Sequence, residues 1–115
     1  MTITIHGVLK SLANQRWHHL TKAKYVKRWR EDVSLMCLVI EVPKANGKAR
    51  HVIATRYGVK MLDADNLASA FKPVLDGLKD AGVIVDDAPG WLTVEYRQVG
   101  VKRGQERIVL EVLNV

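Results

Sequence analysis

The sequence predicts a single α+β domain, in which a small mixed or antiparallel sheet of about four strands carries two main helices. Three observations support this fold class. Four segments have the composition of strands, two have the apolar spacing of helices, and 115 residues suffice for one domain with a modest core. No repeat, low-complexity stretch or linker divides the chain, so we treat residues 1–115 as one domain.

The first half of the chain predicts a strand followed by a long helix. Thr2–Ile5 alternates polar and apolar side chains, which is typical of a strand with one buried face. Residues 9–15 are expected to form a loop. From about His18, apolar residues recur at three- and four-residue steps, which predicts a helix up to about Glu41 that Pro43 ends.

Three further strands are predicted in the second half. After a turn at residues 44–48, Arg50–Leu62 predicts a strand with a bulge or bend at Gly58. Trp91–Val99 and Arg107–Val115 also have strand composition, and a short basic turn separates them. We expect these last two strands to pair as a hairpin.

A second helix is predicted between these strands, over residues 66–81. Its apolar residues have the spacing of one buried face: Leu67, Ala70, Phe71, Val74, Leu75, Leu78 and Ala81. Pro73 removes a backbone donor within this pattern, which predicts a kink near Ser69 or a helix that restarts there. Gly82 suits the chain reversal after the helix, and residues 83–85 have the composition of a buried extended segment.

Carboxylates flank this second helix. Asp65 occupies the expected N-cap, Asp63 lies just before it, and an extended return after the helix would bring Asp87 back to the same end. Lys72 follows Asp65 by seven residues, close to two turns, so the two side chains point almost the same way. Crowded carboxylates repel one another unless a cation lies among them, and Mg²⁺ prefers oxygen ligands. Taken singly, each of these residues is better explained by a structural role, as a helix cap, a turn or a solvated lysine. Together they favour a metal site, because the acids flank one helix in an otherwise basic chain.

Residues 63–87 contain Asp-x-Asp-Asn-Leu, then a lysine, Asp-Gly-Leu, Ala-Gly and an Asp-Asp pair. This stretch resembles the RusA family of Holliday junction resolvases. The resemblance implies a RusA-like fold, Mg²⁺ bound by Asp63, Asp65 and Asp87, and Lys72 as a catalytic lysine. It also implies a homodimer that acts on four-way DNA junctions. Three extra residues separate Lys72 from the Asp-Asn pair relative to the founding pattern of the family, so Lys72 lies farther out on the same face.

The charge of the chain is unevenly distributed. Residues 63–87 carry a net charge of −4, whereas the remaining residues carry +10. A basic surface around an acidic island fits a site that acts on nucleic-acid phosphates. The candidate DNA contacts are Asn14, Arg16, Lys24, Lys27, Arg28, Asn66, Lys102 and Arg103. The cations of residues 16–30, with Trp17, Tyr25 and Trp29 among them, fit either a DNA-binding helix or a solvated helix with its aromatics in the core.

Several other classes of protein are disfavoured. The N-terminus does not read as a signal peptide, and no apolar run is long enough to span a membrane. Cys37 is the only cysteine, so neither an intrachain disulfide nor a zinc cluster of cysteines is expected, which fits a reducing cytoplasm. The histidines lack zinc-ligand spacing.

The sequence therefore predicts a Mg²⁺-dependent endonuclease that resolves four-way DNA junctions by paired symmetric nicks during recombination and repair. Two alternatives stay open. The chain is a non-catalytic protein that binds branched DNA, its acids serving only as caps and turns, or it is a nuclease for other branched DNA such as flaps or forks.

Overall fold

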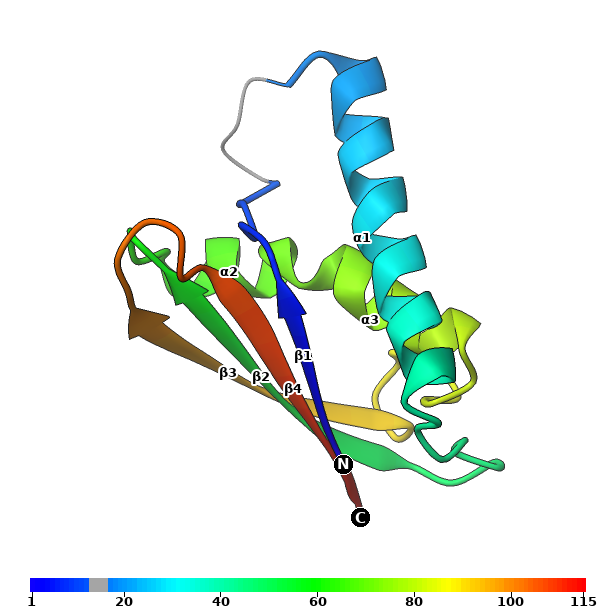
Figure 1. Cartoon of the computed structure of the whole chain (residues 1–115). Coiled ribbons are helices and arrows are strands. Elements are labelled where there is room, and N and C mark those ends of the chain that lie inside the picture. The colour runs from blue at the N-terminus through cyan, green and yellow to red at the C-terminus, as the bar shows by residue number, and fades with distance from the viewer. Residues whose placement is uncertain (13–16) are drawn as a thin grey trace.

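The computed structural model describes residues 1–12 and 17–115. The elements in these residues are, in chain order, β1 (Thr2–His6), α1 (His19–Val39), β2 (Arg50–Gly58), α2 (Ala64–Ala70), α3 (Lys72–Asp80), β3 (Leu92–Gly100) and β4 (Arg107–Asn114). The strands form one mixed sheet, and the helices pack against it (Figure 1). This confirms the α+β fold class with its small sheet.

The sheet has the strand order β1-β4-β2-β3. β4 is antiparallel to both of its neighbours, and β2 is parallel to β3. The expected hairpin of β3 and β4 is therefore wrong, because β2 lies between them. The burial of β2 explains this order: most of its residues are buried, and a strand buried on both faces is typical of the centre of a sheet. Residues 101–106 join β3 to β4 across two strand spacings, about 9.6 Å.

One face of the sheet carries the helices and the core. Ile3, Val52, Ile108 and Leu110 are fully buried there and belong to one cluster with Phe71 and other apolar side chains of the helices. The alternate residues of β1, and most of those of β3, are exposed on the opposite face. This alternation is the pattern of a sheet that is packed on one side and solvated on the other.

Helix α1 has the extent that the sequence predicted. It begins at His19 and ends at Val39, a few residues before Pro43. Trp29, Val33 and Cys37 form its buried stripe. Trp29 is therefore a core residue. This agrees with the alternative in which the aromatic side chains of this helix belong to the core rather than to a DNA-binding surface.

The second predicted helix is divided into α2 and α3. Phe71 is at once the C-cap of α2 and the N-cap of α3, and Pro73 lies in the first turn of α3. This confirms the expected restart, two residues after the expected position at Ser69. Proline is tolerated in a first helical turn, because the amide there has no intrahelical acceptor, so the break at Phe71 removes the conflict.

Two predicted extended segments are shorter or absent. β2 ends at Gly58 rather than Leu62, because the Arg56 guanidinium lies over Gly58 and donates to the Lys60 carbonyl at 2.7 Å, which holds a bend. Residues 83–85 form bends, not a strand, although Val83 is buried. The Val83 amide donates to Leu78 at 3.0 Å, so this segment closes the end of α3 instead of pairing with a strand.

Among residues 1–12 and 17–115, no helix combines the length and the apolar character needed to cross a membrane.

Candidate catalytic and nucleic-acid-binding site

Asp63 is fixed at the start of α2 by two hydrogen bonds. Its Oδ1 accepts from the backbone amide of Asn66, and its Oδ2 accepts from the Asn66 side-chain amide, both at 2.9 Å. Asn66 is buried, and its own oxygen accepts from the hydroxyl of Ser11 at 2.9 Å. The expected N-cap at Asp65 is therefore wrong, because the amide of Asn66 offers Asp63 a second donor and the helix begins two residues earlier.

Two residues that the sequence analysis missed hold this end of α2 in place. Gln98 on β3 exchanges two hydrogen bonds of 2.8 Å with the backbone of Leu62, as a neighbouring strand would. Ser11, in the segment between β1 and α1, holds Asn66 by donating to its side-chain oxygen. Neither residue carries a recognisable sequence signal, because a single amide or hydroxyl acquires this role only from tertiary contacts.

Asp65 lies in the first turn of α2, where its side chain is exposed. In the described part of the chain its carboxylate has no hydrogen bond or ion pair. A carboxylate at this position interacts favourably with the helix dipole, worth about 0.3–1 kcal/mol. The two carboxylate oxygens of Asp65 are therefore accessible to a ligand.

Lys72 and Asp87 are brought together by the loop after α3. The ammonium of Lys72 is in contact with the Asp87 carboxylate and lies 3.3 Å from that of Asp76. The hydrogen bond to Asp87 is the main cause that raises the pKa of Lys72, and the same bond holds the pKa of Asp87 below its usual value. The segment that brings Asp87 back to Lys72, at the start of α3, thus consists of turns and bends rather than a strand.

The carboxylates form two groups rather than one. Asp63 pairs with Asn66, whereas Asp87 pairs with Lys72. Within the residues that the structure describes, no three His, Cys, Asp or Glu side chains are clustered closely enough to hold a metal ion. The donor chemistry still fits Mg²⁺, because the carboxylate of Asp65, two residues after Asp63, has no partner among the described residues. Asp87 would have to exchange Lys72 for the metal.

The predicted DNA contacts that fall within the described residues are exposed, apart from Asn66. Lys24, Lys27 and Arg28 are exposed on α1. Lys27 and Arg28 make long ion pairs, each 3.8 Å, with acids one turn later. Such exposed pairs are weak and exchange readily with other anions.

The other described candidates lie elsewhere in the fold. Lys102 and Arg103 are exposed between β3 and β4. The buried amide of Asn66 is engaged by Asp63 and Ser11, while Asn14 and Arg16 lie outside the described residues.

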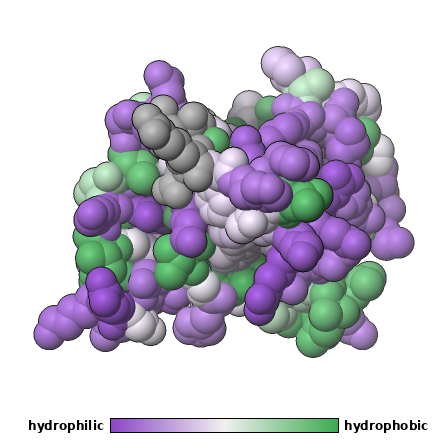
Figure 2. Space-filling model, turned by 90° about the horizontal axis from the view of Figure 1, so that it is seen from above, coloured by the Kyte–Doolittle hydropathy of each residue, from purple (hydrophilic) through white to green (hydrophobic). Residues whose placement is uncertain are grey.

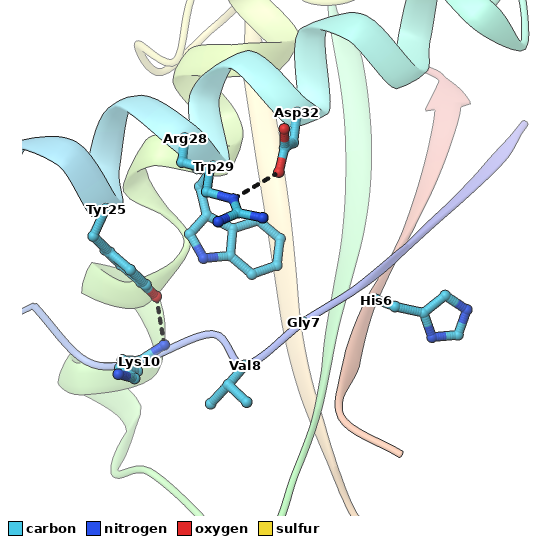
Figure 3. A pocket seen from close by; sticks show the side chains of 8 residues that line it. All are labelled: His6, Gly7, Val8, Lys10, Tyr25, Arg28, Trp29 and Asp32. Atoms are coloured by element: carbon cyan, nitrogen blue, oxygen red, sulfur yellow. Dashed lines mark hydrogen bonds and ion pairs between the residues drawn. The ribbon is translucent and has the colours of Figure 1, made fainter. Parts of the chain in front are cut away.

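A pocket of 330 Å³ lies between α1 and the segment after β1 (Figure 3). Tyr25 and Trp29 project from α1 into it, and the Tyr25 hydroxyl accepts a hydrogen bond of 2.7 Å from the Lys10 amide. Gly7 has a φ of 148°, and a Cβ there would lie 3.3 Å from the Trp29 indole. Trp17 packs on Tyr25 with ring centroids 5.0 Å apart.

Comparison with models of known protein families and with curated proteins found no match. The resemblance to the RusA family therefore depends on residues 63–87 themselves.

Removal of the Lys72 ammonium should slow cleavage more than it weakens DNA binding, if this group lies at the scissile phosphate. In Lys72→Met we expect a rate loss of about tenfold or more, on the scale of one charge-assisted contact. The pKa of Asp87 should rise, because its main stabilising partner is gone. Single-turnover cleavage and a carboxyl NMR titration measure the two effects. Cleavage at the normal rate would show that another cation serves the phosphate.

Proposed function

We propose that this chain is a Mg²⁺-dependent endonuclease that resolves four-way DNA junctions by paired symmetric nicks, as a homodimer in recombination and repair. The observation that carries the proposal is the contact between Lys72 and Asp87. It joins a loop carboxylate to the lysine that begins α3, seven residues after Asp65. Lys72 thus has the carboxylates of Asp76 and Asp87 beside it at the start of α3, and a cation with carboxylates that can hold a metal ion are the groups that phosphodiester hydrolysis needs.

The residues divide the chemical work as follows. Asp63, Asp65 and Asp87 would hold Mg²⁺, which when bound supplies a Lewis acid and an activated water. The hydrogen bonds from Asn66 keep Asp63 in one orientation before any ligand arrives, which lowers the entropy cost of assembling the site. Lys72 balances Asp87 while DNA is absent and offers its ammonium to a phosphate once DNA is bound.

The surface around this site favours a polyanionic substrate. Figure 2 views the end of the molecule that carries the start of α1 and the loop between β3 and β4, and its side chains are mostly hydrophilic. Exposed cations occur on both segments, including Lys24, Lys27 and Arg103. The positive charge outside residues 63–87 would draw the DNA backbone toward the acidic site.

A cleavage assay tests the function directly. The protein is incubated with an end-labelled synthetic four-way junction, with Mg²⁺ and separately with a chelator. Paired nicks at symmetric positions, seen only with the metal, are the expected result. Nicks in flaps or forks but not in four-way junctions would assign another branched substrate.

A non-catalytic DNA-binding role is the second candidate, and one observation favours it. Asp63 already serves as a helix cap and Asp87 as the partner of Lys72, so both acids have structural roles without a metal. The same assay separates the two functions, because this role predicts retention of the junction with no nick under any metal condition.

The second half of α1 offers the proposed dimer an exposed apolar contact surface. Leu35, Leu38 and Val39 are each about two-thirds exposed, at 60%, 62% and 68%. Adjacent exposed apolar side chains of this kind are typical of interaction sites, and two coordinated cuts require two catalytic sites related by a two-fold axis. We expect sedimentation equilibrium at micromolar concentration to give twice the monomer mass. A monomer mass with and without DNA would contradict the dimer.

Reversal of two cations on α1 should weaken binding to all DNA sequences alike. For Lys27→Glu with Arg28→Glu, we expect the affinity for a junction to fall about tenfold or more at low salt. The slope of log affinity against log salt should also fall by about 0.9 per lost phosphate contact. Fluorescence anisotropy over a salt series measures both quantities.

The matched control for this prediction reverses Lys44 and Lys48, which are exposed before the start of β2. It makes the same change in net charge at a different place on the surface. Equal losses of affinity in the two double variants would show that net charge alone explains the effect. An unchanged affinity in the variant with Lys27 and Arg28 reversed would place α1 away from DNA.

A further inference from the structure

Arg56 is a buried arginine near the end of β2. Its side chain is only 6% exposed, its Nε donates to the Leu9 carbonyl, and its Nη1 donates to the Lys60 carbonyl, each at 2.7 Å. No carboxylate of the described residues pairs with it, and its Nη2 has no hydrogen-bond acceptor among them. The guanidinium therefore keeps a donor for another molecule.

The lack of an acidic partner is unusual for a buried charge. Charged groups lose favourable hydration on burial, so they are normally paired with an opposite charge. Here burial lowers the pKa of Arg56, although an arginine remains charged at neutral pH. Two backbone carbonyls supply part of the lost hydration, and an anion would supply the rest.

A small pocket lies at this guanidinium. It has a volume of 230 Å³ and is lined by Val8, Arg56, Val59, Lys60, Arg103 and Glu106. Lys60 and Arg103 are exposed and have no ion pair among the described residues. The carboxylate of Glu106 accepts from the backbone amide of Gly104 in the same loop. Three cations thus face one acid whose carboxylate already has a donor.

We propose that Arg56, Lys60 and Arg103 bind a phosphodiester group of the DNA backbone in this pocket. A guanidinium with a free donor edge suits phosphate oxygens, and the two exposed cations add charge around them. The pocket is smaller than the roughly 300–1,000 Å³ of typical small-molecule sites, which favours a single phosphate group over a whole nucleotide.

The position of the pocket relates it to the candidate catalytic site. Lys60 precedes Asp63 by three residues, so their backbones are at most about 11 Å apart. A phosphate in the pocket would belong to a nucleotide within a few steps of a strand that lies at Asp63. This inference rests on the proposed action on DNA, and it adds a contact that would fix the register of the strand.

The test measures DNA binding without cleavage, so that it does not depend on catalysis. Affinities of the full chain for a four-way junction are determined by fluorescence anisotropy in chelator, over a salt series. The variants are Lys60→Glu and Arg103→Glu, with Lys48→Glu as the control of equal charge change before the other end of β2. All three positions are exposed, and thermal melts verify that the variants fold.

We expect Lys60→Glu and Arg103→Glu each to weaken binding about tenfold and to lower the salt slope by about 0.9, whereas Lys48→Glu changes affinity by less than about twofold. Equal effects of all three would overturn the pocket, because net charge alone would explain them. An NMR titration of the Arg56 Nε–H with inorganic phosphate adds a second readout. A phosphate response without any loss of DNA affinity in the variants would assign the pocket to free phosphate and overturn the DNA contact. If the two variants lose DNA affinity as expected but the parent protein never cuts DNA, only the proposed endonuclease function is contradicted.

Discussion

Asp65→Asn should fold, bind four-way junctions and fail to cut them. The exposed carboxylate of Asp65 has no partner among the described residues, so its replacement removes no structural contact there. It does remove one of the charges that would hold Mg²⁺. We expect the single-turnover cleavage rate to fall at least about a hundredfold, on the scale of losing one preorganised electrostatic contact at a reaction centre.

The other properties of Asp65→Asn should change little. Stability should stay within about 1 kcal/mol of the parent protein, because the loss of a favourable dipole interaction is offset by less repulsion with Asp63. DNA affinity should hold or increase, since one negative charge near a phosphate is gone. Glu95→Gln neutralises an exposed carboxylate on β3 and should cut at the parent rate. Wild-type cleavage by Asp65→Asn at saturating Mg²⁺ would exclude the three-aspartate site.

The sequence predicted local structure well where one periodicity dominated. The apolar steps after His18 defined α1, and the fixed φ of Pro73 together with its missing amide gave the break before α3. The pairing of strands was not predictable in the same way. β3 and β4 are neighbours in sequence, and only the need of β2 for two partners separates them.

The candidate site was predictable in its residue types more than in its contacts. Spacing indicated that Asp87 could return to the end of the helix that carries Asp63 and Asp65. The structure instead places the Asp87 carboxylate against Lys72, in a group separate from Asp63. The helix start was misplaced by two residues, because the capping hydrogen bonds of Asp63 depend on the conformation of Asn66. Arg56 gave no signal at all, since a cation in a predicted strand is normally assigned to the solvated face.

Gly77→Ala should destabilise the fold, against the usual effect of this substitution in a helix. Alanine in place of glycine typically stabilises a helix interior by about 1 kcal/mol. At Gly77, however, a Cβ would lie 2.6 Å from the Arg30 carbonyl oxygen and 2.8 Å from the Cβ of Val33, both on α1. The two helices also cannot separate freely, because the Arg30 guanidinium donates to Asp80 at 2.8 Å.

Overpacking of this kind costs about 1–3 kcal/mol or more, and here the contacts are with backbone and a β-branched residue that cannot rotate away. We therefore expect Gly77→Ala to lower the free energy of unfolding by about 2 kcal/mol, measured by urea denaturation. Lys79→Ala, an exposed change in the same helix, should stay within about 1 kcal/mol. A more stable Gly77→Ala would show that α1 and α3 pack less closely than described. Because α3 begins with Lys72, its displacement should also separate that ammonium from Asp87, which would appear as a higher pKa of the Asp87 carboxyl.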